Sequence, residues 1–147
     1  RAQFADLQHH IDTAVHPKLR FEPLPARDGH PRYVQEVTLL GLRQRDVFER
    51  RFLPGGSMLD TSVEGFNAGG SISAAFSAQT RGGVPGTEVE VGVRLPLPPV
   101  VGSLLRPLLE AQIRRELRAA LAEDKHDLEV RGYPATTSPV AGGLASA

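Results

Sequence analysis

The sequence predicts an α+β fold in which a curved antiparallel sheet wraps around one long C-terminal helix. Two observations carry this prediction. The middle of the chain alternates apolar and polar residues in short segments, which are separated by turns rich in Gly and Pro. Residues 98–130 then follow the pattern of a single amphipathic helix. A sheet and a helix arranged in this way leave room for a cavity between the two layers.

The chain opens with a pattern typical of a short helix over residues 2–15. Its apolar residues recur at spacings of three and four, which places them on one face. These residues are Phe4, Leu7, Ile11 and Val15. The helix is expected to end at His16, because the residue before a proline, here Pro17, is disfavoured in the helical conformation.

Strand patterns fill the region that follows. The predicted strands are residues 18–24, 33–42, 45–52 and 57–64, one marked by apolar residues 72–78, and one marked by apolar residues 89–95. In the last of these strands, valine and leucine side chains point one way while glutamate and arginine point the other. That strand should therefore present one face to the core. Tyr33 and Arg50 fall on strands and can supply polar contacts inside a cavity.

The long helix is about 45 Å at 1.5 Å per residue, enough to cross a sheet. Its apolar stripe consists of Leu109, Ile113, Leu117, Ala120, Leu121 and Leu128. Two acidic residues, Glu110 and Asp124, interrupt this stripe. Residues 134–147 contain few bulky side chains and are expected to form a disordered tail, so residues 1–133 make up the predicted domain.

Composition excludes several classes of function. The chain has no cysteine, which excludes disulfides, thiolate metal ligands and a cysteine nucleophile. Seventeen basic and seventeen acidic residues balance, so no general attraction to nucleic acid is expected. No membrane span or signal peptide is apparent, which predicts a cytoplasmic protein. The chain begins at Arg1 without a methionine, so the domain is expected to be incomplete at its N-terminus.

Three stretches and the terminal helix resemble the START/polyketide cyclase (SRPBCC) superfamily, which has the helix-grip, or Bet v 1-like, fold. The stretches are residues 4–7, 16–22 and 86–89. The resemblance implies a hydrophobic cavity, used across the family for lipids, polyketides, hormones or aromatic compounds. The usual first strand of the family is missing from this chain.

The first functional hypothesis is therefore the binding of a hydrophobic small molecule, such as a lipid, a polyketide or an aromatic compound, without a cofactor. The expected cavity wall consists of Leu59, Val63, Ile72, Phe76, Val89, Val91, Val93, Leu95, Ile113, Leu117 and Leu121. A protein-binding module is a further alternative, which an exposed apolar patch would indicate.

A second hypothesis is an iron-dependent enzyme. His9, His10 and His16 lie close together in the sequence, and clustered imidazoles can bind a metal. The catalytic domains of Rieske-type ring-hydroxylating oxygenases share the helix-grip fold and hold mononuclear iron with two histidines and one carboxylate. By this resemblance, Asp124 on the last helix is the candidate carboxylate. The alternative is that these histidines lie at the surface or cap a helix.

A third hypothesis is acid–base catalysis, as in a cyclase or dehydratase. A carboxylate that faces an apolar cavity has a raised pKa and can exchange protons, which makes Glu110 and Asp124 candidates. The structural alternative pairs Glu110 with Arg114 one helical turn away and leaves Asp124 in contact with solvent.

Overall fold

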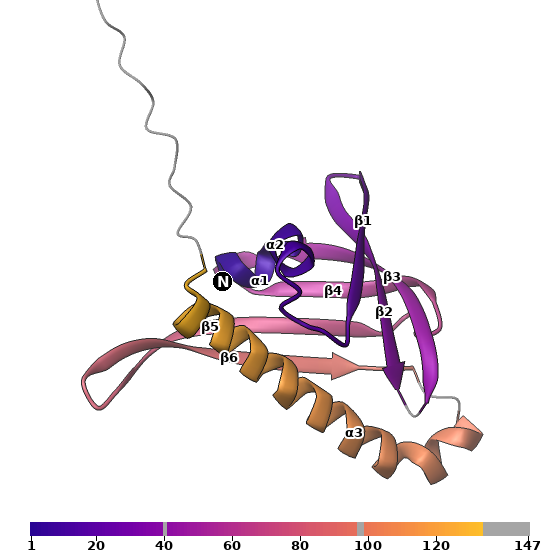
Figure 1. Cartoon of the computed structure of the whole chain (residues 1–147). Helices are drawn as coiled ribbons and strands as arrows, with labels where there is room; N and C mark the ends of the chain where they lie inside the picture. Colours follow the sequence, from indigo (N-terminus) through magenta and orange to yellow (C-terminus); the bar gives the residue numbers. More distant parts are fainter. Residues whose placement is uncertain (40, 97–98, 134–147) are drawn as a thin grey trace, which may run out of the picture.

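The computed structural model describes residues 1–39, 41–96 and 99–133. It shows an α+β fold with a curved antiparallel sheet of six strands and one long C-terminal helix (Figure 1). The strands are β1 (Arg20–Arg27), β2 (His30–Leu39), β3 (Leu42–Phe52), β4 (Met58–Gly65), β5 (Ser71–Arg81) and β6 (Val84–Arg94). They follow one another across the sheet in sequence order, so the predicted curved antiparallel sheet with one long C-terminal helix is confirmed. The predicted tail, 134–147, lies outside the described residues.

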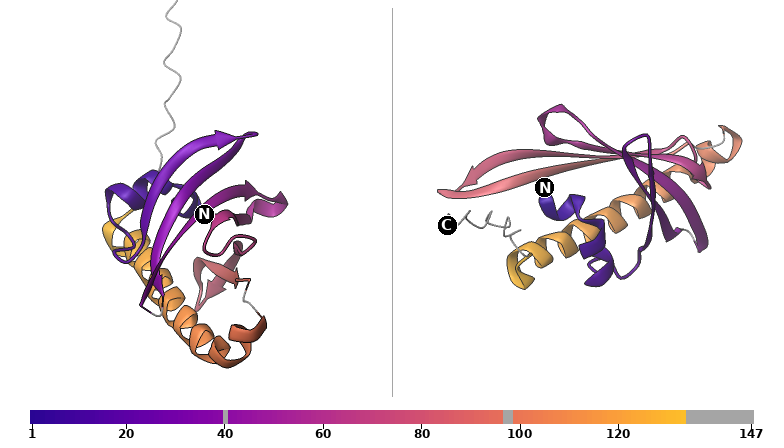
Figure 2. Two further views of the ribbon diagram at one scale, coloured as in Figure 1. Left: turned by 90° about the vertical axis from the view of Figure 1, so that its right-hand side faces the viewer. Right: turned by 90° about the horizontal axis from the view of Figure 1, so that it is seen from above.

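The β5–β6 hairpin extends well beyond the rest of the sheet (Figure 2). Strand β4 pairs with β5 only from Ser71 to Ala74, whereas β5 pairs with β6 along its whole length. Gly82 and Gly83 form the tip, with φ of 58° and 83°. A two-residue hairpin turn that matches the twist of its strands needs positive φ at both positions, which glycine adopts without strain.

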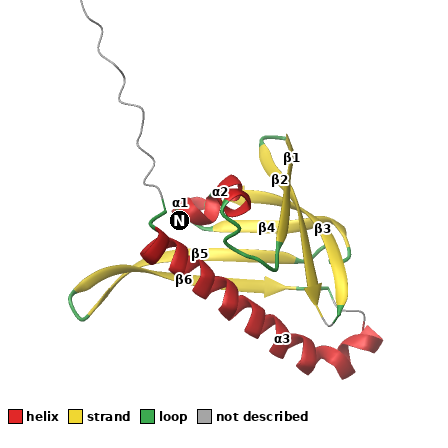
Figure 3. Ribbon diagram, in the orientation of Figure 1, coloured by secondary structure: helices red, strands yellow, loops and turns green. Residues whose placement is uncertain are grey.

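Helix α3 (Pro99–His126) runs across the concave face of the sheet (Figures 1 and 2). It continues into a short π-helix, η2 (Asp127–Arg131), so the predicted single helix changes its hydrogen-bonding pattern near its end. Figure 3 shows the strands in yellow and the long helix that crosses them in red. No helix among the described residues is both long enough and apolar enough to cross a membrane.

The N-terminal segment forms two short helices, and the prediction of one helix over residues 2–15 is wrong. These helices are α1 (Ala2–Ala5) and α2 (Leu7–Asp12). Asp6 separates them, and its carboxylate accepts a hydrogen bond from the backbone N–H of His9 at 2.9 Å. This is an N-cap, which satisfies a donor at the start of the second helix. His9 and His10 therefore lie on α2, whereas His16 lies in the connection to β1.

Strand β4 presents the opposite face to the one that its apolar residues predict. Met58 and Asp60 are buried and line the space under α3, whereas Val63 is 47% exposed. The inward-facing polar residues of β4 find partners on β3, because Arg50 pairs with Asp60 and Asp46 accepts a hydrogen bond from Ser62. Alternation of apolar residues therefore pointed to the wrong face of this strand.

Candidate metal centre and cavity

A cavity of about 560 Å³ lies between the sheet and helix α3. Seven of the predicted wall residues line it, on β5, β6, the residue after β6, and α3. Leu59, Val63, Phe76 and Val89 do not. The first two lie on β4, whose inward face is the opposite one. Phe76 and Val89 lie on the part of the hairpin that extends past β4, where the Phe76 ring packs edge-on against Phe4 with centroids 5.3 Å apart.

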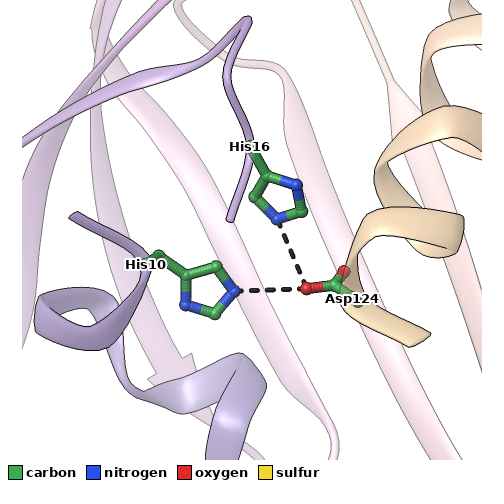
Figure 4. A group of neighbouring side chains, drawn as sticks. All are labelled: His10, His16 and Asp124. Carbon is green, nitrogen blue, oxygen red and sulfur yellow. Dashed lines mark hydrogen bonds and ion pairs between the residues drawn. The ribbon is translucent and has the colours of Figure 1, made fainter. Parts of the chain in front are cut away.

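His10, His16 and Asp124, here called the triad, converge at one point of the cavity wall (Figure 4). They come from α2, from the connection to β1 and from α3. Asp124 Oδ1 lies 3.3 Å from His10 Nε2 and 3.4 Å from His16 Nε2. All three candidate ligand atoms lie within 4.8 Å of one another, and all three residues are buried or nearly so.

Hydrogen bonds to the other ring nitrogen fix the orientation of both imidazoles. His10 Nδ1–H donates to the backbone carbonyl of Asp6 at 2.8 Å. His16 Nδ1–H donates to the Glu123 carboxylate at 2.9 Å. Each Nε2 is thereby directed at the centre of the triad. Metal-binding histidines in proteins are usually held in this way.

The surroundings of Asp124 favour its ionised form. Burial opposes its charge, but hydrogen bonds with His10, His16 and Gln3 outweigh that effect and keep the pKa of Asp124 well below its usual range. Gln3 Nε2–H donates to Asp124 Oδ1 at 3.0 Å. For His16, burial likewise opposes the charge, but Asp124 and Glu123 together raise its pKa. A proton and a metal ion therefore compete for the same imidazole nitrogens.

The donor set and spacing of the triad suit a single divalent metal ion. Ligands about 2.1 Å from one ion and at right angles to each other lie about 3.0 Å apart, a little less than the distances to Asp124 Oδ1 here. Two imidazoles and one carboxylate are typical of non-haem iron(II) sites that keep open coordination positions. All three residues of the triad line the cavity. The residues present therefore fit such an ion.

His9, the remaining predicted ligand, lies outside the triad. Its Nε2 pairs with Asp127 at 2.8 Å. Asp127 also accepts a hydrogen bond from Gln3 Nε2 at 3.1 Å, so Gln3 connects this pair to Asp124. The supporting roles of Gln3, Glu123 and Asp127 were not predicted. Only the proximity of Glu123 and Asp127 to Asp124 in the sequence hinted at them.

Glu110, the other predicted acid–base residue, does not line the cavity. Its side chain is 45% exposed on the surface of α3, where it pairs with Arg106 at 2.8 Å and with Arg114 at 3.7 Å. The pairing with Arg114 is the structural alternative considered for this residue.

A second buried polar cluster, here called the Arg50 cluster, consists of Tyr33, Arg50 and Asp60. The Arg50 guanidinium donates to both oxygens of Asp60, at 2.8 and 2.7 Å. The Tyr33 hydroxyl donates to Asp60 Oδ2 at 2.8 Å. Arg50 also donates to the backbone carbonyl of Phe4 at 3.1 Å, which fastens α1 to the sheet. The cluster lines the cavity, as the positions of Tyr33 and Arg50 on strands allowed.

Comparison with known proteins supports the fold alone. No family model matches the chain, and no curated protein matches it. The crystal structure of TTHA0849 from Thermus thermophilus is similar, with a TM-score of 0.68 over 90% of this chain and 88% of that one. The two sequences are 17% identical. The sheet and helix arrangement therefore occurs in an experimentally determined structure.

Proposed function

We propose that this chain binds a hydrophobic small molecule in its cavity and mononuclear iron at the triad, as the catalytic domain of a ring-hydroxylating oxygenase. The proposal places it among START/polyketide cyclase-like helix-grip proteins. One observation carries the proposal. The Nε2 atoms of His10 and His16 are directed at the same oxygen of Asp124, at the edge of an apolar cavity.

The cavity wall supports binding of an apolar ligand. Burial of apolar surface contributes about 25 cal/mol per Å², so a ligand that buries about 200 Å² gains about 5 kcal/mol. Wall residues on β6 and α3 supply this surface, among them Val91 and Val93 on the strand and Ile113 and Leu117 on the helix. A few polar groups would then set the orientation of the ligand.

The chain's own residues position the donor atoms. The carbonyl of Asp6 and the carboxylate of Glu123 orient the two imidazoles, and Gln3 orients Asp124. Iron(II) bound by such a set supplies reactivity toward dioxygen. Hydroxylation of a C–H bond by dioxygen, with water as the second product, consumes two electrons and two protons. A separate redox centre must supply the electrons, because this chain has no cysteine to hold an iron–sulfur cluster.

Anaerobic titration of the metal-free chain with iron(II) tests the proposal. We expect one tightly bound ion per chain, and we expect His16→Ala to lose it. His126→Ala is the matched control, because His126 is exposed at the end of α3 and makes no contact with the triad. Equal iron binding by wild type and His16→Ala, or none by either, would contradict the proposal.

Binding of an apolar ligand without metal is the second candidate function. The apolar wall on β6 and α3 favours it, since this surface does not depend on the triad. Mass spectrometry of the purified protein under native conditions would detect a retained apolar molecule. If His16→Ala retains that molecule and wild type binds no iron, a carrier function replaces the oxygenase.

A further inference from the structure

Asp46 differs from the other charged side chains that line the cavity. Lys18 pairs with Glu116 at 2.9 Å, Arg50 with Asp60 at 2.7 Å, and the remaining acidic residues with the triad histidines. Asp46 is only 3% exposed, and no oppositely charged group in the described part of the chain pairs with it. Among the described residues, Asp46 is therefore the cavity carboxylate that has neither a basic side chain nor an imidazole against it.

Hydrogen bonds from the protein stabilise this carboxylate without saturating it. The backbone N–H of Asn67 donates to Oδ1 at 2.6 Å, and the Ser62 hydroxyl donates to the same oxygen at 3.2 Å. The Asn67 side chain donates to Oδ2 at 2.8 Å. These bonds also fasten the β4–β5 turn to β3. An ionised carboxylate accepts about four hydrogen bonds and the described residues supply three, so within this part of the chain Oδ2 keeps one position.

Gln35 lies beside Asp46 in the sheet. The two residues are partners in the β2–β3 register, and both line the cavity. Gln35 is half-buried, and within the described residues its amide makes no hydrogen bond. Its carbonyl oxygen can therefore accept a second bond from any donor that Asp46 attracts.

Asp46, Gln35 and Phe21 are neighbours on three adjacent strands, and this row of residues ends near the triad. Phe21 is the partner of Gln35 on the other side, and its ring lies 6.4 Å from the ring of His16, centroid to centroid. Neighbouring strands are about 4.8 Å apart, so Asp46 lies about 10 Å from Phe21. A ligand about 10 Å long with one end beside His16 and Phe21 can therefore reach Asp46 with its other end.

We propose that Asp46 and Gln35 form a subsite for the protonated amine of an otherwise apolar ligand, such as an arylalkylamine. An ammonium group has only donors, which matches the free positions of Asp46 and of the Gln35 carbonyl. It also supplies the missing positive charge. A neutral hydroxyl can form one of these bonds without compensating the charge, and a carboxylate is repelled. This inference rests on the cavity binding proposed above and names its ligand class.

Calorimetric titration of the metal-free full chain with three matched probes tests the subsite. The probes are phenylbutylamine, phenylbutanol and phenylbutanoate at neutral pH. Because the ammonium donates to the carboxylate and also compensates its charge, whereas the alcohol only donates, we expect the amine to bind about tenfold to a hundredfold more tightly than the alcohol. The carboxylate should bind most weakly. Equal or tighter binding of the alcohol would overturn the inference.

Asp46→Asn removes the charge with little change in shape and should abolish the preference for the amine. Glu64→Gln, which changes an exposed carboxylate on β4, is the matched control and should keep it. An unchanged preference in Asp46→Asn would overturn the inference. If that variant does not fold, the comparison of the three probes on wild-type protein still tests the subsite.

The experiment distinguishes failure of the subsite proposal from failure of the proposed function. Binding of all three probes without preference for the amine overturns only the subsite. If none of them binds, both the subsite and the apolar cavity are overturned. Loss of the iron proposal does not affect the test, because it uses metal-free protein.

Discussion

The triad and the Arg50 cluster are both buried polar groups in the wall of one cavity, yet they are built differently. In the Arg50 cluster, the guanidinium and carboxylate meet at 2.7 and 2.8 Å in a two-pronged pair. In the triad, two imidazoles approach one carboxylate oxygen at 3.3 and 3.4 Å. In the Arg50 cluster, hydrogen bonds between the members satisfy the polar groups. The triad leaves space between the atoms that could bind a metal.

This difference separates a structural role from a binding role. Arg50 and Asp60 satisfy each other, and Tyr33 and the carbonyl of Phe4 complete the set. The triad has its outward-facing nitrogens satisfied by Asp6 and Glu123, while its inward-facing nitrogens share one acceptor. Convergence of polar residues in a cavity is therefore not sufficient to indicate a site. Potential metal-ligand atoms that converge, and that share too few hydrogen-bond partners, are the more specific sign of a binding site.

The largest expected effect concerns stability. Arg50→Met should lower the free energy of unfolding by about 3 to 5 kcal/mol, because it leaves the buried charge of Asp60 unpaired. His10→Ala in metal-free protein should lower it less, since Asp124 keeps its contacts with Gln3 and His16. Urea denaturation followed by circular dichroism measures both. A larger loss of stability for His10→Ala than for Arg50→Met would contradict the structural role assigned to the Arg50 cluster.

Metal addition should stabilise wild type through the triad alone. At a free metal concentration one hundred times Kd, the free energy of unfolding should rise by about 2.7 kcal/mol. Tyr33→Phe should show the same increment, because Tyr33 belongs to the Arg50 cluster. His16→Ala should show none, and a chelator should reverse the effect in wild type. An equal increment in His16→Ala would place the metal elsewhere.

The residues that orient the triad should tune its affinity. Glu123→Ala removes the acceptor of His16 Nδ1–H and should raise the metal Kd about tenfold to a hundredfold. Glu129→Ala is the matched control, because this carboxylate is exposed on η2 and pairs only with Lys125 among the described residues. Calorimetric titration measures both. Equal Kd values for the two variants would show that Glu123 has no orienting role.

The smallest expected effect is a pH dependence in the Arg50 cluster. Burial, followed by the negative charge of Asp60, raises the pKa of Tyr33 well above its ordinary value. The folded state therefore keeps a proton that the unfolded state releases above about pH 10. The stabilisation is fully present below that pH and is lost as the pH rises, by at most about 1.4 kcal/mol per pH unit.

Tyr33→Phe provides the measurement of this effect. The free energy of unfolding is compared between wild type and the variant from neutral pH to above about pH 10. We expect the wild-type curve to fall more steeply at the alkaline end. Parallel curves would show that the Tyr33 hydroxyl does not couple to folding.

The sequence predicted the architecture well because the architecture follows from the spacing of apolar residues and from the residues that favour turns. Alternation identified each strand approximately, and spacings of three and four identified α3. The N-terminal helix was predicted as one piece because apolar spacing continues through Asp6. The helix breaks where the Asp6 carboxylate accepts a hydrogen bond from the His9 backbone. The spacing of apolar residues does not indicate this bond.

The triad could be predicted only in part, because its members lie far apart in the sequence. Asp124 attracted attention as an acid within an apolar stripe, and His10 and His16 as clustered imidazoles. Their convergence depends on the bend between α2 and β1 and on the crossing of α3, which no local pattern specifies. The same holds for β4, where partners on β3 make Asp60 and Ser62 inward-facing.

Anomalous diffraction from a crystal of this chain soaked anaerobically with iron(II) tests the central claim most directly. The account predicts one peak bounded by His10 Nε2, His16 Nε2 and an oxygen of Asp124, at about 2.0 to 2.2 Å from each. No peak at the triad, or a peak at the His9 and Asp127 pair in its place, would contradict it.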